Sequence, residues 1–196
     1  MNFLAHAYLS FRQKEILAGN MMSDFVKGNA QYDFPESIRK GIILHRKIDE
    51  FTDTHVVTQR AKEVFRPHYR LYSAPIVDII YDHYLANDTQ IFPGNTLYQF
   101  TQTTYDTLEE FAVYMPLRFA QMFAYMKSEN WLWNYRKTGG IEKSLRGLIR
   151  RSTFVSDSET ACRLFLENYN ELQLCYDAFF SDVKLFTKQQ LDILNA

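Results

Sequence analysis

The segment from Leu44 to Asp53, LHRKIDEFTD, carries metal-binding residue types at helical spacing. In a helix, His45 and Asp49 stand four residues apart and share one face, and Asp53 extends that face by another turn. Imidazole nitrogen and carboxylate oxygen together suit Zn, Mn or Fe. The pattern therefore predicts part of a metal site. The alternative is a solvated His–Asp pair on a helix surface.

A second polar group interrupts the apolar stretch from Pro75 to Leu85. Asp78 and Asp82 are again four residues apart, and His83 follows directly. Like charges at this spacing repel each other, and burying both without a cation is unfavourable. Because the apolar neighbours favour burial, we expect a shared metal ion or a facing arginine. The alternative is that both carboxylates face water.

Two further polar residues stand in apolar surroundings. Asp24 lies near an expected helix end in GNMMSDFVKG, where Lys27 and the Gly28 backbone are placed to meet a phosphate. The simpler interpretation of Asp24 is a turn residue. His6 belongs to a short apolar helix and is either a satisfied core residue or a member of the site. No histidine follows Asn87, so we expect the chemistry in the first half of the chain.

The remaining sequence predicts helices to carry these residues. Seven glycines and five prolines in 196 residues are few for a sheet protein with tight turns. Apolar residues recur at helical spacing in stretches that begin near Ile38, Ile76, Leu97 and Leu164. We predict an all-α fold of about eight to ten helices in one compact domain. Its expected parts are a metal-bearing half at 1–88, a candidate helical subdomain at 89–135 and C-terminal helices at 136–196.

Local breaks set the expected helix boundaries. Helices are expected to begin after Phe34-Pro35 and at Ser73-Ala74-Pro75, and Asn95 is a candidate cap for the helix after Pro93-Gly94. Thr138-Gly139-Gly140 is expected to end a Trp-rich segment, and Asp157-Ser158-Glu159 to open the last long helix.

Composition limits the classes of partner. Hydrophobic residues make up 46% of the chain and charged residues 23%, as in ordinary globular proteins. The net charge of −1 gives no overall field toward nucleic acid or membranes. No apolar run approaches the ~20 residues of a membrane span. Cys162 and Cys175 form no CxxC motif and are expected to be reduced thiols. We therefore predict a cytoplasmic protein without nucleic-acid or membrane partners; the oligomeric state stays open.

Basic residues gather in two segments. Between Glu36 and Arg70, eight basic residues outnumber five acidic ones, a net +3. Between Glu142 and Arg151, four basic residues accompany one acidic residue, again a net +3. Either segment suits an acidic partner, and the alternative is a solvated helix face. Phosphate-binding loops, GxSxG and HExxH are absent, which argues against serine-triad and nucleotide-loop enzymes.

The order of the short motifs is more specific than any one of them. The series runs MNFLAH, GN at 19–20, DFVKG at 24–28, GI at 41–42, LHR and ID at 44–49, TD at 52–53, then Asp78, Asp82-His83 and Leu85. This series resembles the acyl carrier protein phosphodiesterase family. The resemblance is most specific before Asn87 and looser afterward, around Trp131 and the final helices.

The resemblance implies a helical fold with a core related to HD-domain phosphohydrolases. It also implies a divalent metal, expected to be manganese, and hydrolysis of the phosphodiester between 4′-phosphopantetheine and a serine of holo-acyl carrier protein. HD proteins carry adjacent His-Asp, whereas this chain has Asp82-His83 in reversed order. Ligand positions therefore do not transfer directly from HD proteins.

The spacing and the resemblance together assign three sets of residues. Four are expected to bind the metal ion: Asp24, His45, Asp49 and Asp78. Three are expected to act in catalysis, the last two converging on the same ion: His6, Asp82 and His83. Four are expected to bind the substrate, the first two at its phosphate and the others at the acidic carrier protein: Lys27, Arg46, Arg146 and Arg150.

Two other functions stay open. One is an HD-like, metal-dependent phosphohydrolase that acts on nucleotides. The other is a non-catalytic helical module that binds an acidic protein, which predicts no bound metal and water-facing Asp78 and Asp82.

Overall fold

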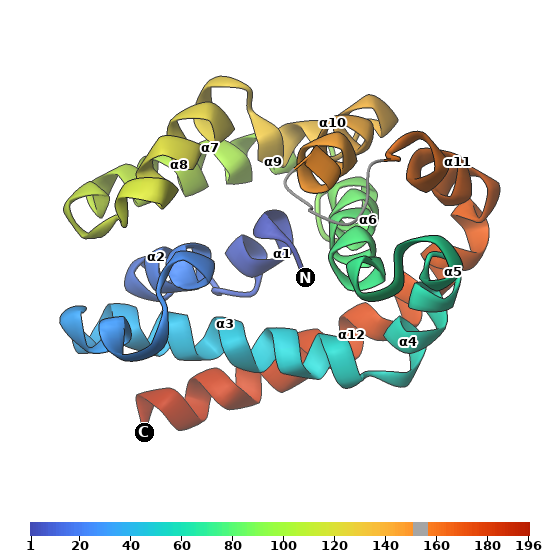
Figure 1. The fold of residues 1–196 in the computed structure, drawn as a ribbon. Coiled ribbons are helices and arrows are strands. Elements are labelled where there is room, and N and C mark those ends of the chain that lie inside the picture. Colours follow the sequence, from blue (N-terminus) through green and yellow to red (C-terminus); the bar gives the residue numbers. More distant parts are fainter. Residues whose placement is uncertain (151–156) are drawn as a thin grey trace.

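The structure is a computed structural model that describes residues 1–150 and 157–196, and every regular element in these two ranges is a helix (Figure 1). The α-helices are α1 Phe3–Tyr8, α2 Lys14–Met22, α3 Glu36–Thr54, α4 Val56–Glu63, α5 Arg66–Tyr69, α6 Ser73–Asn87, α7 Thr96–Glu110, α8 Leu117–Ser128, α9 Trp131–Asn134, α10 Thr138–Arg150, α11 Glu159–Glu167 and α12 Tyr169–Asn195. Short 3₁₀ helices span Ser23–Phe25, Gly28–Asp33, Arg70–Tyr72 and Ala112–Tyr114. The predicted all-α class is confirmed.

Helix α3 lies at the centre of one half of the molecule, between α2 and the long α12 (Figure 1). Its buried face carries Ile38, Ile42, Leu44 and Ile48, the periodicity expected for a helix packed on one side. His45 is buried on the same helix. Helix α3 therefore places His45, a candidate site residue, among buried apolar neighbours.

Two glycines allow α2 and α3 to lie unusually close together. A Cβ atom on Gly19 would stand 1.9 Å from the backbone oxygen of Ile38, and one on Gly41 would stand 2.3 Å from the backbone oxygen of Ile16. No side chain fits at such distances, so the two backbones are in direct contact. This contact fixes the position of α2 and of the turn that follows it.

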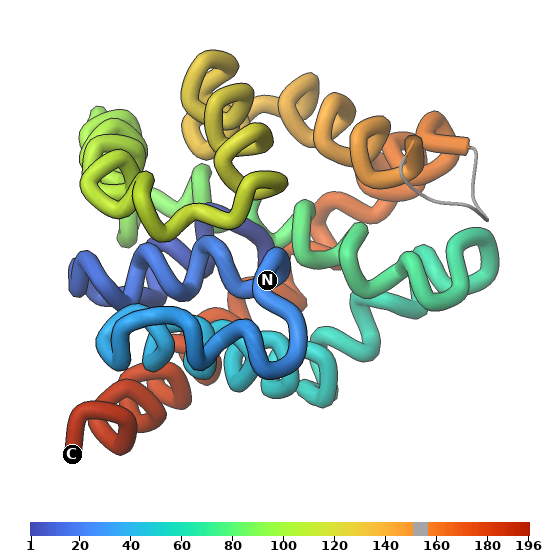
Figure 2. Tube along the Cα trace, turned by 60° about the vertical axis from the view of Figure 1, so that its left-hand side comes forward, coloured from blue at the N-terminus to red at the C-terminus, as the bar shows by residue number. Residues whose placement is uncertain are grey.

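The N-terminus lies near the middle of the view in Figure 2, whereas the C-terminus lies at its edge. Met1 is 5% exposed, and α1 packs against α2 and α6. Helix α10 packs against α6, and α9 packs against α7, α8 and α10. Helices α1, α3 and α6 lie around the N-terminus, and α10 lies next to α6 (Figure 1).

Several predicted boundaries are confirmed. Helix α3 begins directly after Pro35, α6 begins at Ser73, and α7 begins after Asn95. The Asn95 side chain makes no capping hydrogen bond, so its predicted capping contact is absent.

Two boundaries differ from the expectation. Gly139 and Gly140 lie in the first turn of α10, because α9 already ends at Asn134. The expected last long helix is two helices, α11 and α12, separated at Asn168. The Asn168 amide donates to the carbonyl of Leu164 at 2.8 Å and so satisfies a helix end that periodicity alone does not reveal.

Other expectations concern the chain as a whole. Cys175 is buried, Cys162 is half-buried, and both are free thiols. Among the described residues, no helix is long and apolar enough to cross a membrane. The division at residues 88 and 135, the cytoplasmic location and the absence of nucleic-acid partners stay predictions.

Candidate metal centre and its cleft

Two buried histidines from different helices stack on each other. His6 of α1 and His45 of α3 have ring centroids 3.9 Å apart and an interplanar angle of 17°. Asp49, one turn after His45, reaches both rings: Oδ1 lies 3.1 Å from His6 Nε2 and Oδ2 lies 3.0 Å from His45 Nε2. The predicted shared face of His45 and Asp49 is therefore confirmed, and α1 adds a second imidazole to it.

Asp24 approaches the same cluster from the 3₁₀ turn that follows α2. Its Oδ1 lies 3.3 Å from His45 Nε2, and its side chain is exposed on the other side. Ligand atoms of His6, His45 and Asp49 all lie within 4.8 Å of one another, so these residues could hold a metal ion. Imidazole and carboxylate donors are suited to Mn, Fe or Zn.

The protonation of the cluster also favours a cation. Burial lowers the pKa of His6 to about 4, with a further contribution from the neighbouring His45. Burial alone would lower the pKa of His45, but hydrogen bonds to Asp24 and Asp49 outweigh burial and raise it to about 9. Burial opposes ionisation of Asp49, yet the two histidines hold its pKa well below the usual range. The raised pKa of His45 favours a proton on this ring, between the carboxylates of Asp24 and Asp49. A metal ion could take the place of that proton.

One buried atom of the cluster lacks a partner. His45 Nδ1 makes no hydrogen bond to any described residue. A buried polar atom of this kind is normally satisfied by protein, water or an ion. The metal fit rests on the mixed donor set of His6, His45 and Asp49, in which the carboxylate meets Nε2, not Nδ1, of each ring.

Asp82 is fully buried on α6, whereas Asp78 is partly buried with 23% of its side chain exposed, and other cations and donors meet them. Asp78 Oδ1 lies 2.9 Å from the Met1 ammonium nitrogen, which is also 3.6 Å from Asp49 Oδ1. Asp82 accepts from the amides of Leu4 at 2.7 Å and Ala5 at 3.1 Å. The cation beside Asp78 is thus the terminal ammonium instead of the expected metal ion or arginine, and both oxygens of Asp82 hold the first turn of α1.

Burial dominates the ionisation of both α6 carboxyls. It raises the pKa of Asp82 to about 7, against the two amide hydrogen bonds. It also raises the pKa of Asp78, against the neighbouring ammonium. Asp78 is therefore a carboxyl beside the cluster that is easier to protonate than an exposed one.

The structure does not bring His83 to the cluster. Its Nδ1 lies 2.7 Å from the carbonyl oxygen of Tyr135, and its Nε2 lies 2.9 Å from the hydroxyl of Tyr169. Successive helix residues point about 100° apart, so His83 cannot share the direction of Asp82. The expected convergence of His83 is wrong for this reason.

A cleft of about 1300 Å³ opens beside the cluster. Its acidic lining consists of Asp24, Asp49 and Asp78, from the 3₁₀ turn, α3 and α6, together with Glu129, which pairs with Lys143 at 3.8 Å. Its basic lining comes from α10 and the residue before it: Lys137, Lys143, Arg146 and Arg150. Its apolar lining includes Phe25, Ile79, Met122, Trp131 and Leu148. The cleft thus joins a cation-attracting region to an anion-attracting one.

The predicted basic residues fall into different places. Arg146 and Arg150 line the cleft, and Arg146 is paired with Glu142. Arg46 donates to Gln31 Oε1 at 3.0 Å and to the carbonyl of Val26 at 3.1 Å, outside the cleft lining. Lys27 is exposed and is also outside that lining. Arg151 lies outside the described residues.

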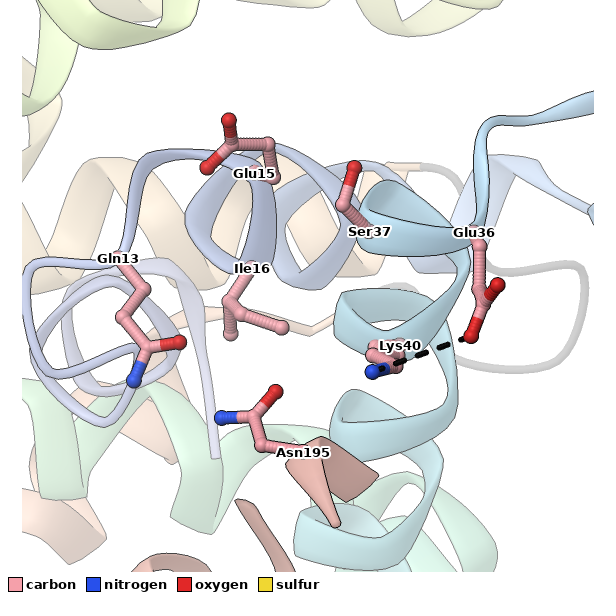
Figure 3. Close-up of a pocket in the computed structure, with 7 residues that line it drawn as sticks. All are labelled: Gln13, Glu15, Ile16, Glu36, Ser37, Lys40 and Asn195. Carbon is pink, nitrogen blue, oxygen red and sulfur yellow. Dashed lines mark ion pairs between the residues drawn. The ribbon is translucent and has the colours of Figure 1, made fainter. Parts of the chain in front are cut away.

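A smaller depression of about 370 Å³ lies where α2 and α3 meet the end of α12 (Figure 3). Glu36 and Lys40 are 3.9 Å apart there, and the lining contains no histidine. This depression therefore lacks the imidazole and carboxylate donors that His6, His45 and Asp49 provide.

Comparison with known proteins identifies the family. The model of the family described as acyl carrier protein phosphodiesterase matches residues 1–183. Proteins named acyl carrier protein phosphodiesterase share 33% identity over 181 residues in Yersinia pestis (92% of this chain, 94% of that one) and 32% over 193 residues in Klebsiella pneumoniae (97% and 100%). The chain belongs to the acyl carrier protein phosphodiesterase family. The protein of this name from Photorhabdus laumondii is 31% identical over 181 residues, 92% of this chain and 91% of its own.

No solved structure matches the chain. The relation of this phosphodiesterase family to HD-domain proteins therefore stays a prediction. The family match spans the candidate metal ligands, the residues that line the cleft and α10. The roles of individual residues rest on their geometry.

Sequence reasoning missed the cleft wall and one buried polar residue. Phe25, Met122 and Trp131 come from separate elements, and no spacing in the chain brings them together. Asn20, fully buried beside His6, carried a usable signal: it is a polar residue inside the apolar run from Ile16 to Met22.

Proposed function

We propose that this chain hydrolyses the phosphodiester between 4′-phosphopantetheine and a serine of acyl carrier protein, releasing the apo-protein. One observation carries the proposal: an imidazole–carboxylate cluster shares a cleft with the basic face of α10 in a member of this family. Such a cleft has groups for a phosphodiester on one side and for an acidic protein on the other.

The metal centre is assigned to His6, His45, Asp49 and Asp24, with manganese as the expected ion. A bound divalent ion polarises a phosphoryl oxygen and lowers the pKa of coordinated water. Support comes from the contacts of His45: Asp24 Oδ1 lies 3.3 Å and Asp49 Oδ2 lies 3.0 Å from its Nε2, and the ring of His6 stacks on its ring. Metal analysis of the purified protein tests the identity of the ion.

Asp78 is assigned to proton transfer rather than to the first set of ligands. It lines the cleft beside Asp49 and already pairs with the terminal ammonium. Burial raises its pKa, which suits a group that gives a proton to the departing serine oxygen. Asp82 is assigned to holding α1, and with it His6, through the amides of Leu4 and Ala5.

The substrate is assigned to the rest of the cleft. Arg146 and Arg150 provide positive charge for the acidic carrier protein and for the phosphate. Phe25, Met122 and Trp131 offer an apolar wall for the slender pantetheine arm. Lys27 and Arg46 stand outside this path, so we assign the phosphate to α10 instead.

The test is a mass assay with purified protein, Mn²⁺ and holo-acyl carrier protein. The expected result is loss of the phosphopantetheine mass from the carrier, and no loss in the presence of EDTA. Nucleotide mono- and diesters are assayed in parallel. Turnover of nucleotides alone would support the HD-like phosphohydrolase instead, and carrier binding without turnover or bound metal would support the non-catalytic module.

A further inference from the structure

Asn20 is a fully buried polar residue next to the proposed metal centre, and all of its polar atoms are satisfied. Its Oδ1 lies 2.8 Å from His6 Nδ1. Its Nδ2 donates to the carbonyl oxygen of His6 at 3.0 Å and to Ser10 Oγ at 3.0 Å. Ser10 Oγ in turn donates to the same His6 carbonyl at 2.8 Å. Asn20 thus contacts both the ring and the backbone of one residue.

These contacts determine which way the Asn20 amide points. The His6 carbonyl can only accept a hydrogen bond, so the amide nitrogen must face it. A flipped amide would put its oxygen against the carbonyl oxygen of His6, and two acceptors in contact repel each other. The amide oxygen is therefore the atom that faces His6 Nδ1.

The orientation of the amide then determines the tautomer of His6. An amide oxygen can only accept, so Nδ1 of His6 carries the ring proton. Nε2 of the neutral ring is left with a lone pair. Its near neighbours are Asp49 Oδ1 and the carbonyl oxygen of Met1, each at 3.1 Å, and both are acceptors. A lone pair that faces two acceptors is favourable only when a cation or a proton lies between them.

The second histidine has no such partner. His45 Nδ1 makes no hydrogen bond to a described residue, although the ring is buried. The two stacked imidazoles therefore differ, since one is oriented by the protein and the other by the carboxylates it meets.

We infer that Asn20 is a positioning residue that holds His6 as its Nδ1–H tautomer, so that Nε2 presents a lone pair to a divalent cation. The inference rests on the proposed metal centre. A hydrogen-bond partner on the non-ligating nitrogen orients a metal-binding histidine and raises its affinity for the ion. Asn20 is supplied by α2, whose position is set by the Gly19–Gly41 contact with α3.

The first experiment reads the tautomer directly. Long-range ¹H–¹⁵N NMR on the metal-free protein, with ¹⁵N-labelled histidine, is expected to show His6 protonated on Nδ1, and Zn²⁺ is expected to shift the Nε2 signal. In Asn20→Leu the Nδ1–H form is expected to be no longer dominant. A wild-type protein in which His6 is protonated on Nε2 alone overturns the inference, and this measurement needs no variant to fold.

The second experiment measures Mn²⁺ binding from the electron paramagnetic resonance signal of free Mn²⁺. Asn20→Leu is expected to weaken binding by about 10- to 100-fold, whereas Asn20→Asp keeps an acceptor on Nδ1 and is expected to lose less than about tenfold. The matched control is Ser10→Ala, which leaves the His6–Asn20 contact intact and is expected to stay within about twofold. Mn²⁺ binding by Asn20→Leu as tight as in the wild type overturns the inference, as does equal weakening by Asp and Leu.

Failure of the inference and failure of the proposed function give different results. Carrier-protein turnover by the wild type with unchanged Mn²⁺ affinity in Asn20→Leu rejects only the role of Asn20. The expected tautomer and Mn²⁺ affinities without carrier-protein turnover reject only the proposed reaction.

Discussion

His6 and His45 form the centre of the site because a carboxylate reaches both. Asp49 spans the two Nε2 atoms with its two oxygens, at 3.1 and 3.0 Å. Without a metal ion, the pair shares about one proton near neutral pH, because the pKa of one ring is lowered and that of the other is raised. The cluster is therefore a place where proton and metal compete.

Asp49→Asn tests the carboxylate at this centre. The amide keeps the shape of the side chain but removes the charge and one acceptor, so the cation loses a ligand. We expect turnover of holo-acyl carrier protein to fall by at least about 100-fold, since even indirect ligand partners contribute 10- to 100-fold. Circular dichroism should stay helical. Glu50→Gln, an exposed change on the same helix, is the control, and full activity in Asp49→Asn would refute the centre.

The histidine pair predicts the pH dependence of the metal-free protein. Burial, followed by repulsion from His45, lowers the pKa of His6 from 6.5 to about 4, so folding loses a proton there and stability rises with pH up to 6.5. Hydrogen bonds to Asp24 and Asp49, outweighing burial, raise the pKa of His45 from 6.5 to about 9, so stability falls between pH 6.5 and 9, by about 3 kcal/mol.

The measurement is urea unfolding with EDTA across pH 4–9, compared between the wild type and the double variant His6→Gln, His45→Gln. The difference in unfolding free energy should be largest near pH 6.5, the ordinary pKa from which both rings are shifted. A difference that does not change with pH would show that the rings do not share a proton in this way.

At the scale of elements, the α2–α3 contact determines how the site is assembled. Helix α3 supplies His45 and Asp49. Helix α2 supplies Asn20 and is followed by the 3₁₀ turn that contains Asp24. The two helices approach so closely that their glycines meet backbone on the partner helix. Separation of the helices would therefore move Asp24 and Asn20 relative to the histidines.

Gly19→Ala and Gly41→Ala should be strongly destabilising. The added Cβ would meet the carbonyl of Ile38 at 1.9 Å or that of Ile16 at 2.3 Å, and backbone cannot move aside without parting the helices. We expect a loss of about 3 kcal/mol or more in the free energy of unfolding. Gly147→Ala is the matched control, because its Cβ meets no atom within 4 Å, and it should stabilise α10 by about 0.5–1 kcal/mol. Equal effects at all three glycines would contradict the close contact.

On the scale of the whole molecule, charge is separated although the net charge is only −1. Acidic residues of the turn after α2, of α3 and of α6 line one part of the cleft, and α10 lines another with Lys143, Arg146 and Arg150. Figure 1 shows α10 on the opposite side of the molecule from the C-terminal end of α12. We therefore expect a partner of negative charge to meet the α10 side of the cleft.

Charge reversal on that face should weaken substrate capture. We expect Arg146→Glu and Arg150→Glu each to raise KM for holo-acyl carrier protein by about 3- to 10-fold with a smaller change in kcat, because their charge contributes more to the encounter with the acidic carrier protein than to holding its phosphate. Added salt should raise the KM of the wild type in the same direction. Lys188→Glu on α12, where Lys188 pairs with Asp192 at 2.7 Å, is the control. A KM that ignores salt and both reversals would remove the docking role of α10.

The sequence by itself determined the features that depend on spacing within a single helix. The all-α class follows from apolar periodicity, and the His45–Asp49 pair follows from the geometry of residues four apart. The order of short motifs also indicated the family that the comparisons show. The burial of Asp82 was predictable from its apolar neighbours, whereas Asp78 stays partly exposed and the partners of both were not predictable.

Only the tertiary structure decided how separate helices meet. The stack of His6 on His45 depends on the placement of α1, which packs on α2 and α6. His83 is directed away from the cluster because consecutive helix residues diverge, and its partners, the Tyr135 carbonyl and the Tyr169 hydroxyl, lie far along the chain. Contacts between helices depend on crossing distances and on which faces are buried together, and these are properties of packing that no spacing within a single helix records.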